Sequence, residues 1–253
     1  MSTVLYIATF LVIFNGVHMS NAECNGTYGD ANSNYVTYCD LNDTLRSQLV
    51  ERFNSTNFHD FISKVVRLEF HDCMGPLEYN LNASKRVSIC DGCIGFDNGA
   101  HEGLPTNAVN RLEGIYNDPT NNWRNRISRA DFWAASATIA LQYSNYLSMT
   151  TDLHASTPNP NQSLPYIPFY IGRTDCSAAP DVNESNYAIP FQSFPDALAG
   201  WEKNYQLFKG SFGFSEREYT AILGAHTLGR VHLRLSGFGT VAGICIHCLS
   251  LSP

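Results

Sequence analysis

Apolar residues recur at helical spacing in four separate segments of the chain. The segment 41–53 carries a leucine at every fourth position, and 58–72 carries phenylalanine, isoleucine and valine near a period of 3.6 residues. These patterns predict two amphipathic helices. The segment 128–144 is rich in alanine and aromatic residues and predicts a buried helix, with Ser128 as its N-cap. A fourth helix is predicted over 215–232.

The segments between these helices read as irregular structure. Ser215 and Glu218 have capping-box spacing, which marks where the fourth helix begins. Residues 74–106 are rich in Gly, Asn and Asp and predict a long loop. Residues 157–175 contain four prolines and predict an extended connector or a short strand. Strand patterns are sparse, so the chain is expected to be mainly α.

Composition narrows the class of protein. The chain has 253 residues, 44% of them hydrophobic and 15% charged, which is typical of a globular protein with room for one large domain or two small ones. The net charge is −7 and no run of Lys or Arg occurs. This balance argues against nucleic acid as a partner.

The first residues predict export from the cell. The apolar run Val4 to Phe14 precedes "SNA" and is too short to span a bilayer, so residues 1–22 are predicted to be a cleaved signal peptide that leaves no membrane anchor. Six Asn-x-Ser/Thr sequences agree with a secreted glycoprotein: Asn25, Asn42, Asn54, Asn82, Asn161 and Asn183. In such a protein the cysteines form disulfides, whose pairing stays open: Cys24, Cys39, Cys73, Cys90, Cys93, Cys176, Cys245 and Cys248.

Two histidine segments are the candidates for chemistry. In "VVRLEFHDC", Arg67 and His71 lie four residues apart and project from one helical face, where two cations repel each other slightly. The pair is either an incidental surface feature or a site for a small polar ligand. In "AILGAHTLGR", His226 is flanked by small residues that leave room for a close approach. Taken alone, His226 is equally explained as a core histidine.

Together these segments resemble the distal and proximal histidine signatures of the plant-type haem peroxidase superfamily. That group includes ascorbate peroxidases, fungal ligninolytic peroxidases and secreted plant peroxidases. Between them, "SRADFWAASATIAL" is similar to the family's central helix and "IPFYIGRTD" to its connector. The resemblance implies a mainly α, two-domain fold with haem b between a distal domain (23–155) and an incomplete proximal domain (156–238).

The resemblance also implies a role for each matching residue. His71 would move a proton between the two oxygens of hydrogen peroxide, and Arg67 would stabilise the charge that develops as their bond breaks. Phe70 would pack on the distal side of the haem, and His226 would be the iron ligand. The partners would be hydrogen peroxide and a small reducing substrate oxidised by single electrons, and the protein is expected to be a monomer.

A metal is a further expectation from the resemblance. Asp72 and Asp91 match calcium ligands of some members, and Thr227 matches a position of a second calcium site. The match is incomplete because Cys93 replaces a hydroxyl residue near Asp91. A zinc site built from Cys73, Cys90 and Cys93 is the alternative to disulfides in this loop.

Two departures from the family concern the partner of the distal histidine and the residues linked to the reducing substrate. An Asn that orients this histidine is replaced by His101, which could accept the same hydrogen bond, unless the loop shifts to use Asn98. Ascorbate-using relatives carry Trp where this chain has Phe70, and Arg where it has Leu235. These two positions favour small aromatic donors over ascorbate.

The end of the chain is the third departure. Residues 239–253 match nothing expected of the family, and an Asp that would bond the proximal histidine has no counterpart. Cys245 and Cys248 in this tail could form a redox pair or a metal loop. Two alternatives to an enzyme therefore stay open: a non-catalytic secreted glycoprotein that keeps part of the fold, and a zinc-stabilised binding protein.

Overall fold

The computed structural model describes ten stretches of the chain: 17–18, 27–28, 36–37, 40–55, 58–74, 90–151, 169–176, 180–181, 194–196 and 199–229. The longer helices are α2 (Arg46–Ser55), α3 (Phe58–Cys73), α4 (Asn110–Tyr116), α5 (Arg129–Thr151), α6 (Trp201–Phe212) and α7 (Glu216–Leu223). Shorter helical turns are η1 (Asp40–Leu45), η2 (Gly99–His101), η3 (Pro105–Val109), η4 (Trp123–Asn125) and η6 (Gly224–Thr227). The strands are β1 (Val17–His18), β2 (Thr27–Tyr28), β3 (Val36–Thr37) and β4 (Tyr170–Ile171).

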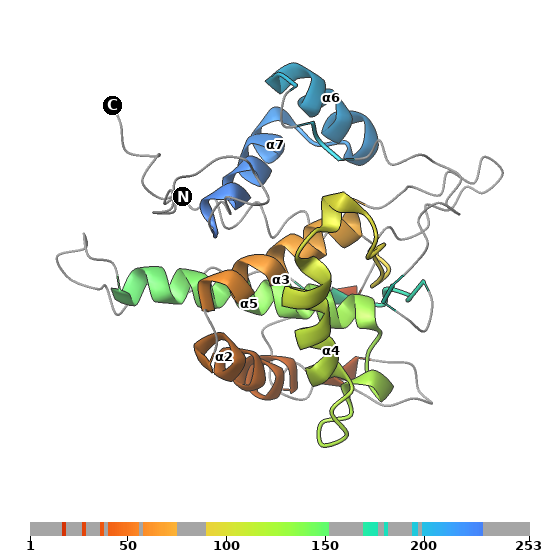
Figure 1. Ribbon diagram of the computed structural model, residues 1–253, viewed down its shortest axis with the longest axis vertical. Helices are drawn as coiled ribbons and strands as arrows, with labels where there is room; N and C mark the ends of the chain where they lie inside the picture. Colours follow the sequence, from red (N-terminus) through yellow and green to blue (C-terminus); the bar gives the residue numbers. More distant parts are fainter. Residues whose placement is uncertain are drawn as a thin grey trace.

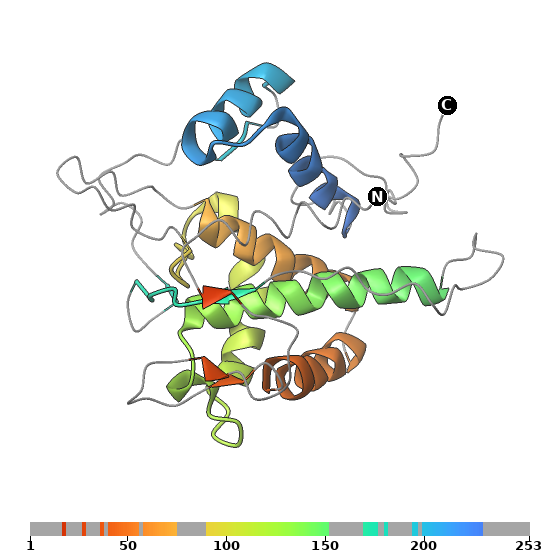
Figure 2. The same ribbon diagram turned by 180° about the vertical axis from the view of Figure 1, so that it is seen from behind.

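Helices α3 and α5 form the centre of the molecule. Figures 1 and 2 show α2 on one side of this pair and α6 with α7 on the other. The strands form two small antiparallel pairs, β1 with β4 and β2 with β3. The mainly α class predicted from the pattern is confirmed.

The first part of helix α5, residues 129–141, is buried on all sides, as its composition predicts. Phe132, Trp133 and Ala134 are consecutive, so they point in three directions, and all are buried. Ser128 is its N-cap, because its hydroxyl accepts a hydrogen bond from the Asp131 amide at 3.1 Å. The helix begins where the sequence predicts and ends seven residues later, at Thr151.

The helices predicted over 41–53 and 58–72 are also confirmed. Leu41, Leu45 and Leu49 are all buried, although the first turn, η1, is a π-helix and not an α-helix. On α3 the core face carries Phe61, Val65 and other apolar side chains. The opposite face is left for the polar residues described below.

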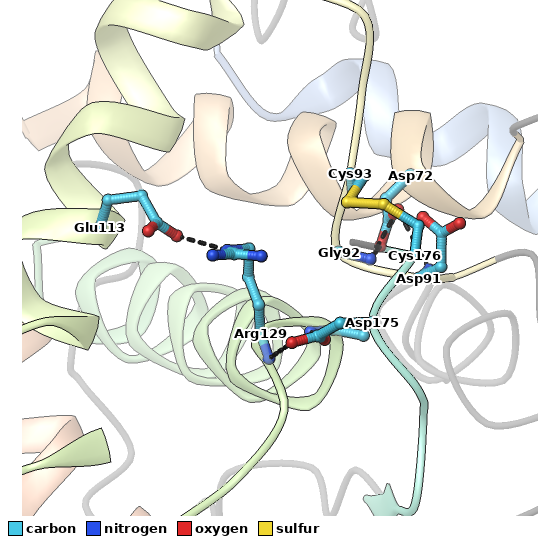
Figure 3. The surroundings of a disulfide bond; sticks show 9 residues. Asp72, Asp91, Gly92, Cys93, Glu113, Arg129, Asp175 and Cys176 are labelled. Carbon is cyan, nitrogen blue, oxygen red and sulfur yellow. Dashed lines mark hydrogen bonds and ion pairs between the residues drawn. A yellow bond between two sulfur atoms is a disulfide. The ribbon is translucent and has the colours of Figure 1, made fainter. Parts of the chain in front are cut away.

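The "Gly-Arg-x-Asp" connector is tied to the start of α5. Arg173 forms an ion pair with Asp131 at 2.9 Å, and the Gly172 amide donates to the same carboxylate. Asp175 accepts from the first two amides of α5, those of Arg129 and Ala130 (Figure 3). A carboxylate at a helix N-terminus is stabilising, so the connector's polar residues have structural roles.

Helices α6 and α7 build a second, aromatic core, and the sequence analysis missed α6. Its Trp201, Tyr205, Phe208 and Phe212 follow a helical period that is visible in the sequence. Their cluster packs against the C-terminal end of α3 at Met74. The ribbon views place α6 over that end of α3, with α7 running back over the helix towards its other end (Figure 1).

Helix α7 begins as predicted but ends early. Ser215 and Glu218 form the expected capping box, with Glu218 Oε2 accepting from the Ser215 amide at 2.8 Å. The predicted helix over 215–232 was too long: α7 stops at Leu223 and continues as the 3₁₀ turn η6.

Two disulfides join the connections around α3. Cys73 pairs with Cys90, and Cys93 pairs with Cys176. The disulfides preferred for this loop are thus present. They exclude the alternative, a zinc site from Cys73, Cys90 and Cys93, because disulfide sulfurs are not thiolate ligands. Cys24, Cys39, Cys245 and Cys248 lie outside the described residues.

The export signals fall largely outside the described part of the chain. Of the predicted signal peptide 1–22, the structure describes only β1, which pairs with β4. The tail 239–253 is not described either. Among the helices that are described, none is both long and apolar enough to cross a membrane.

Candidate active site

Arg67 and His71 form a direct contact on the polar face of α3. Arg67 Nε donates a hydrogen bond to His71 Nε2 at 3.2 Å, and the imidazole is 8% exposed. The helical spacing that predicted a shared face is therefore confirmed. The two groups interact as a neutral imidazole and a guanidinium, not as two repelling cations.

His101 lies against the other ring nitrogen of His71. The two Nδ1 atoms are 2.9 Å apart, and His101 is 1% exposed. Of the two candidates from the sequence, His101 is therefore the residue that contacts His71. The Asn98 side chain instead accepts from the Ala100 amide and caps η2, the short turn that carries His101.

The guanidinium of Arg67 also holds the loop that carries His101. Its two terminal nitrogens donate to the carbonyls of Ala100, at 2.7 Å, and Glu102, at 3.0 Å. These carbonyls flank His101 in the chain. Arg67 therefore fixes the position of both histidines at once, which a planar group with five donors can do.

The surroundings keep the His71 imidazole neutral. Burial lowers the pKa of His71 well below its usual value, and the charges of Arg67, His101 and Lys64 lower it further. Burial also lowers the pKa of Arg67, and the Glu102 carboxylate opposes that shift. Arginine nevertheless stays protonated in proteins. The site thus combines an uncharged base with a fixed cation.

His226 lies in a different setting from the one predicted. The sequence placed it within a helix, but it lies in η6 and is exposed. The 3₁₀ turn forms because the chain tightens after Leu223, where the Thr227 hydroxyl donates to the Gly224 carbonyl at 2.7 Å. His226 Nδ1 lies 3.2 Å from the Leu223 carbonyl, which can only accept. Nδ1 therefore carries the hydrogen, and Nε2 is the nitrogen with a lone pair.

The segment after α7 runs back along α3. Near one end of α3, Ile222 of α7 belongs to the cluster that contains Met74. At the other end, Gly229 approaches Ser63 so closely that an added Cβ would lie 2.7 Å from Ser63 Cβ. His226 lies in the chain between these two anchors. Its segment is therefore held beside the helix that carries Arg67 and His71 (Figure 2).

The family model for peroxidases, described as "Peroxidase", matches residues 45–243. The chain belongs to the peroxidase family. The match spans both histidine segments and the connector between them. The superfamily resemblance read from these segments is thus confirmed.

Curated relatives match shorter parts of the chain. The cytosolic L-ascorbate peroxidase 1 of Oryza sativa subsp. indica is 32% identical over 132 residues, which is 52% of this chain and 40% of the rice protein. A heme-binding peroxidase of Gibberella zeae is 31% identical over 55% of this chain and 34% of its own length. A heme-binding peroxidase of Debaryomyces hansenii is 38% identical over 29% of this chain and 16% of its own length. The matches thus span well under half of each relative, and no solved structure matches this chain.

The residues at the site fit a haem, the cofactor of this peroxidase superfamily. His226 offers the nitrogen with a lone pair on an exposed imidazole, and its other nitrogen is fixed by a carbonyl, as in many metal-binding histidines. Phe70, half-buried on α3, supplies an apolar ring beside Arg67 and His71. Haem, when bound at such residues, supplies the redox chemistry of peroxide cleavage.

The predicted calcium ligands do not fit a cation in this structure. Asp72 accepts hydrogen bonds from the backbone amides of Asp91, Gly92 and Cys93 at 3.0 to 3.3 Å (Figure 3). A cation would need the oxygens that these amides occupy. Burial raises the pKa of Asp72, as do the neighbouring Glu69 and Asp91, and burial raises that of Asp91 to about 6.

The other atoms near these acids do not complete a calcium site either. Cys93, close to Asp91 in this loop, is bonded to Cys176 and offers no hydroxyl. Thr227, the residue matched to a second calcium site, lies in η6, where its hydroxyl donates to the Gly224 carbonyl. We therefore derive no calcium-dependent step.

Phe194 completes the site and was missed in the sequence. Its ring lies 4.6 Å from that of His71, 5.8 Å from that of His101 and 6.4 Å from that of Phe70, between centroids. It precedes α6 by a few residues and is half-buried. No spacing rule links it to α3, because the contact depends on how α6 docks.

Proposed function

We propose that this chain is a secreted haem-dependent peroxidase that reduces hydrogen peroxide and oxidises small aromatic donors by one-electron steps. The observation that carries the proposal is the contact between Arg67 Nε and His71 Nε2, with His101 behind it. It provides a neutral base and a fixed cation side by side. Those are the two groups needed to move a proton and to stabilise charge as the peroxide bond breaks.

Each residue has a defined task in this proposal. His226 would hold the cofactor through Nε2, and Phe70 would limit access to it. His71 Nε2 takes a proton from one peroxide oxygen and returns it to the other. Arg67, anchored on two carbonyls, orients the peroxide and stays in place while the proton moves.

The donor class and the compartment are inferred from other features of the chain. Phe70 and Leu235 stand where ascorbate-using relatives carry Trp and Arg, which favours aromatic donors, although the rice relatives are named as ascorbate peroxidases. The two disulfides among the described residues favour an oxidising compartment, in agreement with the predicted signal peptide. The donor class is tested by comparing the rates at which the protein oxidises a simple phenol and ascorbate. Secretion is tested by looking for the N-glycosylated chain in the medium of eukaryotic cells that express it.

A haemin titration of the purified chain tests the enzyme itself. The wild type should show a sharp Soret band that changes on adding peroxide and recovers with a phenol. His226→Ala should lose the band, while Thr220→Ala, on the exposed surface of α7, should keep it. His71→Leu should bind haemin and react with peroxide about 10²- to 10⁴-fold more slowly.

One observation favours the alternative of a non-catalytic secreted glycoprotein. His226 is exposed, and its Nδ1 partner is a carbonyl and not a carboxylate, which gives a weaker iron ligand. A folded chain that binds no haemin would establish this alternative. Folding can be checked independently by the two disulfides and by the helical circular dichroism signal.

A further inference from the structure

The two buried histidines share a single hydrogen bond. His71 Nδ1 and His101 Nδ1 are 2.9 Å apart, and both rings are more than nine-tenths buried. A hydrogen bond between two ring nitrogens needs one donor and one acceptor, so only one of the two Nδ1 atoms carries a hydrogen. The rest of the site decides which one does.

Arg67 fixes the direction of this bond. A guanidinium can only donate, so His71 Nε2, at 3.2 Å from Arg67 Nε, must accept and carries no hydrogen. The hydrogen of neutral His71 therefore sits on Nδ1 and is donated to His101 Nδ1. His101 in turn carries its own hydrogen on Nε2. The chain of contacts runs from Arg67 through His71 to His101.

We propose that His101 is a positioning residue that also accepts a proton, so that His71 and His101 work as a two-histidine relay. The proposal rests on the proposed function of His71 as the base. Arg67 Nε first transfers its hydrogen bond from His71 Nε2 to the peroxide, which frees the Nε2 lone pair. As a peroxide O–H proton then binds His71 Nε2, the Nδ1 hydrogen of His71 passes to His101 Nδ1. His71 ends neutral with its hydrogen on Nε2, and His101 ends as an imidazolium.

The return step balances the relay. The Nε2 hydrogen of His71 passes to the departing oxygen, and the hydrogen on His101 Nδ1 moves back to His71 Nδ1. Both histidines regain their starting tautomers and exchange no electrons, because the haem would supply the two electrons that cleavage of the O–O bond needs. A side-chain amide at position 101 could accept the first hydrogen bond but could not take up the proton, because an amide is not a base at neutral pH.

The charges around the pair explain why a second acceptor helps. Arg67 contacts the Nε2 side of His71, and Lys64 of the same helix adds positive charge, so an imidazolium on His71 is disfavoured. His101 lies on the other side of the ring, next to Glu102, whose carboxylate faces Arg67. The ring of Phe194 packs against both imidazoles. Transfer to His101 moves the charge off the ring that Arg67 contacts.

The first test needs no cofactor. Long-range ¹⁵N–¹H spectra of the haem-free, ¹⁵N-labelled chain report which ring nitrogen of each histidine carries hydrogen. His71 should appear as the Nδ1–H tautomer in the wild type and in His101→Asn, whose amide oxygen accepts the same bond. His101→Phe, in which Arg67 still donates to Nε2, should keep the Nδ1–H tautomer but lose the chemical shift of a hydrogen-bonded Nδ1 proton. An Nε2–H tautomer of His71 in the wild type, or the same Nδ1–H chemical shift in His101→Phe, would overturn the proposal.

The second test separates a relay from positioning alone. The rate of the haemin-loaded chain with peroxide is measured in mixtures of H₂O and D₂O. If two protons move in the rate-limiting step, the rate falls along a curve as the deuterium fraction of the solvent rises. If one proton moves, the rate falls along a straight line. We expect a curve for the wild type and a straight line for His101→Asn. A dependence of the same shape in the wild type and in His101→Asn would refute the relay. If neither protein reacts with peroxide, the proposed function fails, and the relay fails with it, whatever tautomer the first test finds.

Discussion

Gly229 and Ser63 meet at the point where the His226 segment returns to α3. A Cβ on Gly229 would lie 2.7 Å from Ser63 Cβ and 3.0 Å from its hydroxyl oxygen. Gly229 also has φ of +100°, a conformation that other residues rarely adopt. The contact is therefore specific to glycine, and it holds the segment of the proposed iron ligand beside the distal helix.

Replacing Gly229 by alanine should loosen this contact. Gly229→Ala should destabilise the chain by about 1 to 3 kcal/mol, because it adds backbone strain to a steric clash. Urea unfolding measures the change. Adding Ser63→Gly should recover the part due to the clash and leave the part due to φ. An equal cost of Gly229→Ala in both backgrounds would show that the two residues do not touch.

The three acceptors of Arg67 predict how lysine would behave at this position. A lysine has one terminal nitrogen and cannot reach His71 and the carbonyls of Ala100 and Glu102 in the same geometry. Arg67→Lys should therefore slow the peroxide reaction of the haemin-loaded chain by about 10²- to 10³-fold. It should also speed amide hydrogen exchange in residues 100–102. Unchanged exchange there would mean that Arg67 does not hold the loop.

Asp72 should matter for folding and not for metal binding. Asp72→Ala leaves three buried backbone amides without their acceptor and should cost about 1 to 3 kcal/mol or more. Asp118→Ala is the matched control, because Asp118 is an exposed acceptor in a turn. Both are measured by urea unfolding with and without calcium. Strong calcium-dependent stability in the wild type that Asp72→Ala abolishes would contradict this assignment.

The sequence predicted the parts of this site that depend on local periodicity. The four-residue spacing of Arg67 and His71 places both on one face of a helix, whatever the rest of the fold does. The capping box at Ser215 is equally local. These were confirmed because backbone geometry alone determines them.

Features that depend on docking were missed or only partly predicted. The sequence left two possible partners for His71, Asn98 and His101. The structure decides between them, because Asn98 caps the turn η2 and His101 on that turn contacts His71. Phe194 was not found because it reaches the site through the placement of α6. The turn at His226 was predicted as helix because the pattern "AILGAHTLGR" contains no proline to end one.

Glu69 supplies the last prediction, on the side of α3 that faces the core. It is fully buried, and its Oε2 has no hydrogen-bond partner among the residues that the structure describes. Oε1 lies 3.5 Å from Cys73 Sγ, a disulfide sulfur with no hydrogen to donate. Burial raises the pKa of Glu69 from 4.5 to about 7; Arg173 opposes the shift and Asp131 adds to it. The folded state therefore keeps a proton on Glu69 between these two values, where the unfolded chain has lost it.

This difference makes the contribution of Glu69 to stability depend on pH. The contribution is fully present below pH 4.5 and is lost as the pH rises towards about 7, in total on the order of 3 kcal/mol. Glu69→Gln cannot ionise, so its free energy of unfolding relative to the wild type should rise by that amount between pH 4 and pH 8. Glu51→Gln, at an exposed position on α2, should show no such trend. Denaturant unfolding at several pH values measures both, and parallel curves for wild type and Glu69→Gln would show that Glu69 is ionised in the folded chain.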